Sequence, residues 1–441
     1  MNTIAIDCGA SFIKGALFVD GKIVFETKRQ SPVVHERNIP IIEPIQVKAL
    51  EELVVQILKV LTKHLPDNKY TVCVSNEMHG FLLVDECGEP VTDYISWQVC
   101  LGGGLGKKYF EQTCFYEEIK NTGMQLREGL PLCNLWALLH QEFPQYEVSQ
   151  KTKYRFCDLG SYIIERISGM KMESHPTNAG GTGLFDLRSG EFNRKLIDAV
   201  VSDTGYCVEF PMIGTKKYVD GNVTYKPAIG DHQAALLGAN MSEKGLSFNL
   251  GTGAQVAVVR PMYNISDRWQ VQPYFDGKYV HRIPFLPSGR GLNVYFRFFK
   301  SIFEAVNVSI EDSLLWTAIQ RTSEKTLNPK LTVDLSFFEN KVTDHTVGSI
   351  QNIGEYDLTF ENVVVSILCQ MSENFMEASR TLLDDELNTI QEICFTGGIA
   401  ERFKRIREEI VSNFPTDVVV RMTDKETFLG LNRYANLVNE D

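Results

Sequence analysis

The sequence predicts an α/β fold made of two similar domains that face each other across a cleft. The chain has 441 residues, about twice the usual size of one compact domain. Strand-like runs alternate along it with segments of helical periodicity. The pattern of strand, glycine turn and strand that opens the chain restarts near residue 240. We therefore expect one domain over residues 1–240 and a second over residues 241–441.

The first half begins with a predicted antiparallel meander. Residues 3–29 alternate strand-like runs with turns, and Asp20-Gly21 is a strong hairpin signal. Residues 46–64 carry apolar side chains at helical spacing. Further strands are predicted at 70–75 and 81–84.

The middle of the first half has a different composition. Residues 130–170 are predicted to be mostly helical, with breaks at Pro131 and Pro144, because proline lacks the N–H group that a helix interior needs. Residues 173–190 are rich in glycine and are predicted to form loops.

The second half repeats the opening pattern. Strand-like runs over 246–250 and 254–259 flank a glycine turn, as two runs flank Gly9 near the start. We interpret this as a weak internal repeat, although two unrelated hairpins would give the same pattern. The remaining predicted elements are a long helix, a strand, a helix, a strand and a last helix, over residues 360–386, 393–395, 400–412, 417–421 and 426–437.

Charge and composition exclude several classes of function. The net charge of −12 argues against a general nucleic-acid binder, which needs a basic face for phosphate backbones. No apolar run approaches the length of a membrane span, and the N-terminus has no basic leader. The ten cysteines form no C-x-x-C pair, which favours reduced thiols. We expect a cytoplasmic protein without nucleic-acid or membrane partners.

Two glycine turns, one in each half, could bind a nucleotide triphosphate. The first contains Asp7, Gly9 and Ser11, with Lys14 nearby, and the second is Gly251-Thr252-Gly253. Glycine lets backbone N–H groups approach phosphate oxygens without a side chain in the way. Asp7 ends a strand and is the natural carboxylate for Mg²⁺, through water. Each turn alone is a weak signal, and Lys14 can equally be a solvated strand residue.

Asp231 is the sharpest candidate for catalysis. It lies in Gly230-Asp231-His232-Gln233, at a change from loop to a helix of small residues. An Asp in this position can simply cap the helix. It can also accept a proton from a hydroxyl that attacks phosphorus. The two roles are compatible, and the local sequence leaves both open.

Two further segments could contact substrates. Met78-His79 follows a strand, and near a cleft the imidazole could bond a sugar hydroxyl while Met78 packs on the carbon face. A lone histidine is more often structural. Thr396-Gly397-Gly398 joins a strand to a helix, either as a tight connection or as a close approach of backbone to adenosine.

Taken together, these segments resemble the FGGY family of carbohydrate kinases over nearly the whole chain. The matching segments, in order, are Ile4–Lys14, Asn76–Gly80, Pro227–Ala235, Asn249–Gly253 and Phe395–Gly398. The resemblance implies two ribonuclease-H-like (actin-like ATPase) domains that close on ATP and a sugar. It also implies that Asp231 is the general base, that Met78 and His79 touch the sugar, and that Mg-ATP is the phosphate donor.

The subtype is suggested by a few residues. Ile95-Ser96-Trp97-Gln98 and residues 285–292 look most like xylulokinase and sedoheptulokinase relatives. We therefore expect a ketose such as xylulose or sedoheptulose, with Trp97, Gln98 and His232 also in the sugar site. Two departures leave the sugar open. Ala10 replaces the threonine usual in the first phosphate turn, and no acidic residue follows Trp97 within two positions.

Three hypotheses follow from this sequence. The first is an ATP-dependent sugar kinase that uses Mg²⁺, as a monomer or a homodimer. The second is a catalytically silent sensor of the same fold that binds sugar and nucleotide. The third is an actin- or chaperone-like ATPase, in which the Met78-His79 segment and Asp231 would have no evident role. Retention of Asp7, Asp231 and both glycine turns favours the kinase.

Overall fold

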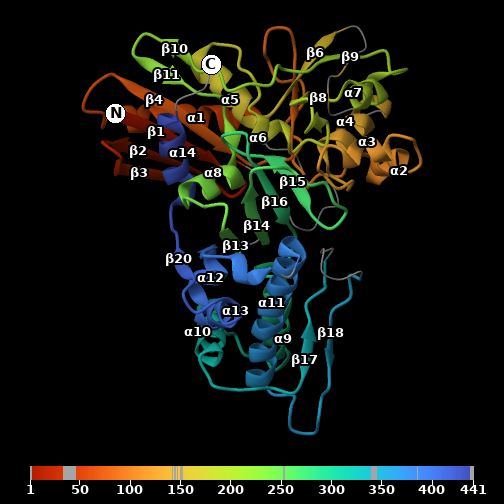
Figure 1. Ribbon diagram of the computed structural model, residues 1–441, viewed down its shortest axis with the longest axis vertical. Coiled ribbons are helices and arrows are strands. Elements are labelled where there is room, and N and C mark those ends of the chain that lie inside the picture. Colours follow the sequence, from red (N-terminus) through yellow and green to blue (C-terminus); the bar gives the residue numbers. More distant parts are fainter. Residues whose placement is uncertain are drawn as a thin grey trace.

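The protein contains two large β-sheets, one above the other in Figure 1, with helices around them. A computed structural model describes residues 2–32, 46–141, 143, 146, 148, 152–251, 254–338, 345–384 and 386–437. The first sheet lies in the upper part of Figure 1 and the second below it. Each sheet has its own apolar core, and a third core lies beside the first sheet.

The first sheet contains the predicted N-terminal meander. Its strands run in the order β10-β11-β4-β1-β2-β3, and β12 also pairs with β4. Their bounds are β1 Asn2–Cys8, β2 Phe12–Val19, β3 Lys22–Gln30, β4 Tyr70–Asn76, β10 Tyr218–Asp220, β11 Val223–Tyr225 and β12 Ile229–Gly230. Asp20 and Gly21 have φ angles of 49° and 77°, as a two-residue hairpin turn requires. The predicted strands and the hairpin are confirmed.

The second sheet has the same central topology. Its order is β15-β16-β14-β13-β19-β20, with β13 Gly245–Asn249, β14 Gln255–Arg260, β15 Gln270–Pro273, β16 Tyr279–Ile283, β19 Glu392–Thr396 and β20 Val419–Met422. In both sheets the opening strand pairs antiparallel with the next strand in sequence. It pairs parallel with a later strand, β4 in one case and β19 in the other. The internal repeat expected from the sequence is therefore a repeat of topology.

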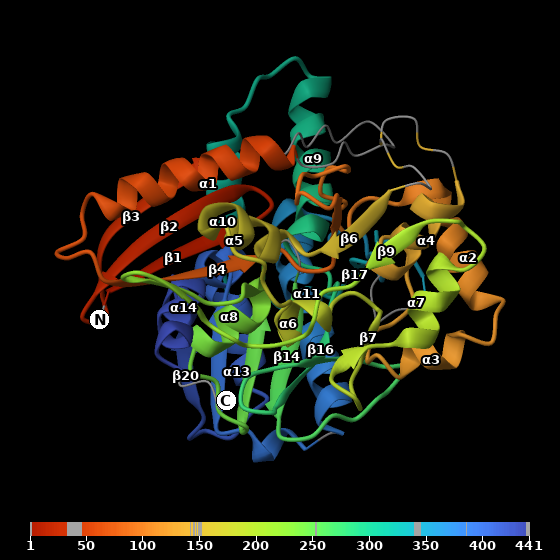
Figure 2. The same ribbon diagram turned by 90° about the horizontal axis from the view of Figure 1, so that it is seen from above.

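Helices cover the faces of both sheets (Figure 2). Those that contact the first sheet include α1 Val47–Thr62, α5 Leu159–Ser168, α8 Asp231–Gly238 and α14 Glu426–Asn436. The lower part contains α9 Gly289–Ala305, α10 Asp312–Ser323, α11 Phe360–Leu383, α12 Gly398–Arg402 and α13 Lys404–Val411. Within the described residues, no helix combines the length and the apolar character that crossing a bilayer would require.

The prediction for residues 130–170 was partly wrong. Helix α4 (Pro131–His140) and α5 are present, but strand β6 (Lys153–Cys157) lies between them. Strand β6 pairs with β5 (Leu82–Val84) and β9 (Cys207–Glu209), and its last four residues are buried. Pro131 does not break a helix but starts one, because the first turn needs no N–H donor there. Pro144 lies outside the described residues.

The C-terminal helix α14 packs on the first sheet rather than the second. Phe428, Leu431 and Tyr434 form an apolar cluster with residues of β1, β2 and β4, including Ala5 and Phe18. The helix crosses α8 so closely that a Cβ atom on Gly430 would overlap the backbone of Ala234. The boundary at residue 240 stays a prediction, and α14 is a part of 241–441 that packs on the first half.

Candidate active site

Three carboxyl groups come together at one edge of the first sheet. Strands β1 and β12 both run parallel to β4, on either side of it, and Cys8, Asn76 and Gly230 occupy the same register. The side chains next to these positions are Asp7, Glu77 and Asp231. Because the carboxyl ends of parallel strands meet at the same edge, residues far apart in sequence converge there, and ligands of such sheets bind at this edge.

Asp231 is the first residue of α8, and its carboxylate is not a typical helix cap. The N-cap position is Gly230, which has no side chain, and the Asp231 Oδ1 atom accepts a hydrogen bond of 2.7 Å from the adjacent His232 N–H. Burial and the charge of Asp7 raise the pKa of Asp231 to about 6, while the Arg282 cation opposes the shift. Asp231 is only half-buried. It is thus a partly accessible base with a pKa close to neutrality.

Asp7 is fixed by its neighbours on both sides. The Ser75 hydroxyl donates to Asp7 Oδ1 at 3.0 Å, and Lys14 Nζ lies 3.4 Å from Asp7 Oδ2. The Lys14 side chain is 44% exposed, so it can turn from Asp7 to an anionic ligand. The Asp7 carboxylate suits a water-mediated Mg²⁺ contact. Among the described residues, no group of three or more His, Cys, Asp or Glu side chains could hold a metal alone.

The two glycine segments of the second domain lie against each other. The Leu250 N–H donates to the Thr396 carbonyl at 2.9 Å, and the Ile399 N–H donates to the Leu250 carbonyl at 3.1 Å. Gly397 has a φ angle of 93°, and a Cβ atom there would lie 2.7 Å from the Leu250 backbone. Gly398 has open space where its Cβ would be. The structure therefore brings Gly251 and Gly397 together, whereas Thr252 and Gly253 lie outside the described residues.

In the first glycine turn, Gly9 and Ser11 connect β1 to β2 at the edge that carries Asp7. Gly9 is half-buried and Ser11 is exposed. The backbone and the hydroxyl of this turn are therefore accessible to a ligand.

The predicted sugar residues fall into two groups. Met78 is buried beside the turn that carries Asp231, where a Cβ on Gly230 would lie 2.6 Å from its Sδ atom. His79 is already saturated, since its Nδ1 atom lies 2.7 Å from the Gly181 carbonyl and its Nε2 atom 2.7 Å from Arg282 Nη2. With Nδ1 protonated, Nε2 accepts from the guanidinium. Both ring nitrogens of His79 are therefore already hydrogen-bonded, one of them to Arg282. Neither is left to bond a sugar hydroxyl.

Trp97 and Gln98 line the same region from a loop. Both are half-buried, and the Trp97 ring lies 6.0 Å from the Phe285 ring. The Arg127 guanidinium lies over both rings, 5.6 Å from Trp97 and 5.3 Å from Phe285. This aromatic and cationic wall was only partly predicted, because Arg127 carries no local signal in the sequence.

Several buried polar atoms around Asp231 have no hydrogen-bond partner among the described residues. They are Glu77 Oε1, both ring nitrogens of His232, Gln233 Oε1 and Gln270 Nε2. Buried polar atoms are almost always paired, so each unpaired one needs an explanation. A cluster of them beside an accessible carboxylate is the arrangement expected where a polyhydroxylated ligand supplies the missing partners.

Glu77 is a site residue that sequence reasoning did not single out. The residue is 8% exposed, and its carboxyl interacts with both Asp231 and Trp97. Burial and the Asp231 charge raise the pKa of Glu77 to about 8, while the hydrogen bond with Trp97 acts in the opposite direction. At neutral pH Glu77 is therefore a protonated acid that can donate a hydrogen bond.

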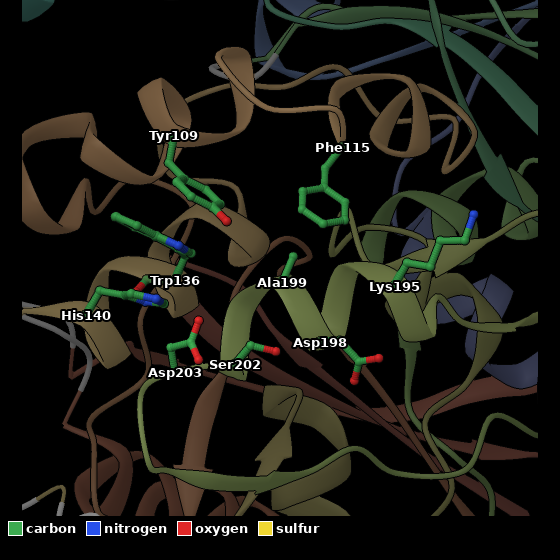
Figure 3. Close-up of a pocket in the computed structure, with 9 residues that line it drawn as sticks. All are labelled: Tyr109, Phe115, Trp136, His140, Lys195, Asp198, Ala199, Ser202 and Asp203. Atoms are coloured by element: carbon green, nitrogen blue, oxygen red, sulfur yellow. The ribbon is translucent and has the colours of Figure 1, made fainter.

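A separate pocket lies between α2 (Leu105–Glu111), α4 and α7 (Arg194–Val201), away from these residues (Figure 3). Its volume is about 570 Å³, and its lining residues are Tyr109, Phe115, Trp136, His140, Lys195, Asp198, Ala199, Ser202 and Asp203. None of the predicted site residues lines it.

Comparison with known proteins identifies relatives of this chain. The N-terminal domain of the FGGY family of carbohydrate kinases matches residues 2–224. A glycerol kinase of Mycoplasma genitalium is 27% identical over 212 residues, which are 45% of this chain and 41% of that protein. A xylulose kinase of Staphylococcus xylosus is 24% identical over 159 residues, 36% of this chain and 32% of the relative. These matches therefore span less than half of either relative.

Solved structures match over a greater length. A ligand-bound xylulose kinase and a gluconate kinase, both from Lactobacillus acidophilus, superpose on this chain with a TM-score of 0.80 each. Each is 18% identical, and the superpositions cover 100% of this chain and 90% and 91% of theirs. At this identity the likeness bears on the fold alone. It confirms the predicted two-domain, actin-like architecture.

Proposed function

This chain belongs to the FGGY family of carbohydrate kinases, and from that premise we propose that it is an ATP-dependent carbohydrate kinase. It transfers the γ-phosphate of Mg-ATP to a hydroxyl of a small carbohydrate. Asp231 accepts the hydroxyl proton as the oxygen attacks phosphorus. The single observation that carries this proposal is the partly accessible Asp231 carboxylate, with a pKa of about 6, amid buried polar atoms that lack partners.

The phosphate side of the site is built by both domains. Asp7, Gly9, Ser11 and Lys14 would face the phosphates from the first domain, and the turn at Gly251 from the second. A bound Mg²⁺ would offset charge on the phosphate oxygens, held near Asp7 through water. Gly397 and Gly398 would allow the adenosine moiety to approach the backbone. Lys14 Nζ lies 3.4 Å from Asp7. Because the lysine side chain is exposed, it would turn away from Asp7 to contact a phosphate.

The acceptor side is formed by Met78, Trp97, Gln98 and His232, with Glu77 beneath them. His232 supports this role because both of its buried ring nitrogens lack a partner among the described residues. A ketose remains the expectation from sequence, and the cytoplasmic location and a homodimer likewise remain predictions. The sensor and ATPase hypotheses are weaker, because neither gives the base at Asp231 a function.

The proposal is tested by measuring ADP release with Mg-ATP and a panel of ketoses, aldoses, polyols and sugar acids. Strong stimulation by one class is expected. Asp231→Ala should lower the stimulated rate by about 10²- to 10⁴-fold and leave nucleotide binding nearly intact. Asp417→Ala, at an exposed position, is the matched control. ADP release that no acceptor stimulates, or an Asp231→Ala variant of normal activity, would refute the mechanism.

A further inference from the structure

Arg282 is buried in the face of the second sheet that meets the catalytic edge of the first. It lies on β16, in register with Ala257 of β14 and Gln270 of β15, and it is 6% exposed. Its guanidinium donates to Gln270 Oε1 at 3.2 Å, to Gln255 Oε1 at 3.1 Å and to His79 Nε2 at 2.7 Å. All three acceptors are neutral. Each of the two terminal nitrogens still has a second N–H to offer.

The Arg282 side chain is hydrogen-bonded to neutral groups. Within the part of the chain that the structure describes, Arg282 is in no salt bridge with a carboxylate. The acid that interacts with it most clearly is Asp231, which lies beyond contact distance but near enough for the two charges to influence each other. A buried cation without a partner is strongly unfavourable unless a ligand provides one.

A second cation reinforces this positive region. Arg127 lies over Trp97 and Phe285, and its charge acts on both Arg282 and His79. The neighbouring Glu77 is neutral at pH 7. The segment after Trp97 continues Gln98-Val99-Cys100, without the acidic residue that a neutral sugar's hydroxyls would favour. The acceptor end of the site thus brings two guanidinium groups near the Asp231 carboxylate.

We propose that Arg282 and Arg127 bind a carboxylate on the acceptor, and that the acceptor is a sugar acid of the aldonate class. This inference rests on the proposed kinase function and refines its substrate. The hydroxyl to be phosphorylated lies at Asp231, and the carboxylate lies toward Arg282. His79 orients the guanidinium by accepting from it, which explains why an imidazole held by the Gly181 carbonyl stands in the sugar segment. Arg282 is a specificity-determining residue in this scheme.

The first test compares acceptors that differ only at one carbon. D-gluconate, D-glucose and D-glucitol share a carbon chain and carry a carboxylate, an aldehyde or an alcohol at C1. Xylonate, xylose and xylitol form a second set. The kcat/KM for ADP release should be at least about 10-fold higher with the acids than with the neutral acceptors, because a charge-assisted hydrogen bond contributes that factor or more. Efficient use of a neutral sugar with no use of acids would overturn this inference and leave the kinase function standing. A response to neither would refute both.

The second test uses variants. Arg282→Gln keeps a polar side chain but removes the charge, and should lower kcat/KM for the acid by about 10- to 100-fold, mainly through KM. The KM for ATP should change little, and kcat/KM for the alditol should fall much less than kcat/KM for the acid. Arg127→Gln, at a half-buried position, should show a smaller loss in the same direction. Arg268→Gln is the control, because Arg268 also lies over an aromatic ring, Trp269, but is exposed and pairs with Asp384.

The variant results separate recognition from structure. An equal loss for acids and neutral sugars would mean that Arg282 only holds the two domains together through His79, and the inference would be wrong. If only the KM for ATP rose, the Arg282 guanidinium would bind a phosphate rather than the acceptor's carboxylate, and the inference would again be wrong. Binding of the aldonate to the wild-type protein without nucleotide, followed by thermal shift, gives a readout that does not depend on how well the Arg282 variant folds.

Discussion

At the scale of single residues, Asp231 is held between opposing charges that set its basicity. Burial and Asp7 raise its pKa to about 6, and Arg282 lowers it. Only the ionised form can accept a proton, so kcat/KM should be constant above about pH 6 and fall tenfold for each pH unit below it. Arg282→Gln should move this acid limb to higher pH, because it removes a stabilising cation. A pH profile of both proteins checks this, and an unmoved limb would assign it to another group.

Glu77 gives a second prediction, on stability. Its pKa rises from an ordinary value of 4.5 to about 8 in the folded chain. Between these two pH values the folded state holds a proton that the unfolded state releases, so the wild-type protein loses stability as pH rises, by up to about 1.4 kcal/mol per unit. In Glu77→Gln the side chain is neutral at every pH, so the variant should not lose this stability as the pH rises. Urea unfolding should show little difference at pH 4.5 and a more stable variant at pH 8.

The control for Glu77 is Glu86→Gln, an exposed glutamate in a surface turn, which should follow the wild type at every pH. The opposite result would be a Glu77→Gln variant that loses stability relative to the wild type as the pH rises from 5 to 8. It would mean that the Glu77 carboxylate is ionised and that the fold needs its charge.

The sequence could identify site residues that belong to a local motif. It could not identify residues that reach the site only through the pairing of distant strands. Asp7 and Asp231 could be singled out from the sequence because Asp7 lies near the end of a strand and Asp231 follows one, each close to a glycine. Arg282 was not, because nothing in Tyr279–Ile283 marks it, and only the antiparallel pairing of β14, β15 and β16 aims it at the first domain. The sequence predicts His79 in the sugar site because an imidazole can bond a sugar hydroxyl. Its two partners, Gly181 and Arg282, lie 102 and 203 residues away, and no local pattern contains them.

At the scale of elements, the crossing of α8 and α14 fixes the position of the turn that carries Asp231. Gly238 and Gly430 let the two backbones approach, and a Cβ on either would overlap main-chain atoms of the other helix. Gly430→Ala should therefore destabilise the protein by about 1–3 kcal/mol, although alanine is the better helix former. It should also reduce kcat, because α8 carries Asp231 at its first residue.

The matched control for Gly430→Ala is Asn436→Ala, at an exposed position of α14, which should not reduce stability or kcat. Thermal unfolding and ADP release measure both effects. A stabilised Gly430→Ala variant would show that helix propensity outweighs the close approach and that the two helices can separate without harm.

Elements with a strong period were predictable, and short ones were not. The 16-residue α1 and the 24-residue α11 follow the apolar periodicity of their sequences. The sequence predicts helix where the five-residue β6 lies, because Tyr154 and Phe156 alternate over too short a run to compete with the helical segments on either side. Residues 400–412 were expected as one helix, but Phe403 turns into the core with a φ angle of −115° and divides α12 from α13.

At the scale of the whole molecule, the chain closes on itself through α14. Phe428 and Leu431 pack on Ala5 and Phe18, and the buried Lys226 donates to the carbonyls of Tyr434 and Leu437 at 2.7 and 2.8 Å. The end of α14 is therefore bonded to the first domain, next to the strand that leads to Asp231. The stability of the first sheet must then depend on residues more than 400 positions from its first strand, which sequence order would assign to the second domain.

This dependence predicts the outcome of a truncation. A chain ending at Thr423 should lose protection against proteolysis in the first sheet, over residues 2–30 and 70–76, while the second sheet stays protected. Activity should be lost as well, because α8 would no longer have the helix against which it packs. A chain ending at Leu437, which retains α14 and its contacts with Lys226, is the control and should resemble the full chain. Mass spectrometry of the fragments locates the cuts. If the loss of protection were confined to residues 245–260 and 392–422, α14 would be a stabilising element of the second sheet, and the first domain would fold without it.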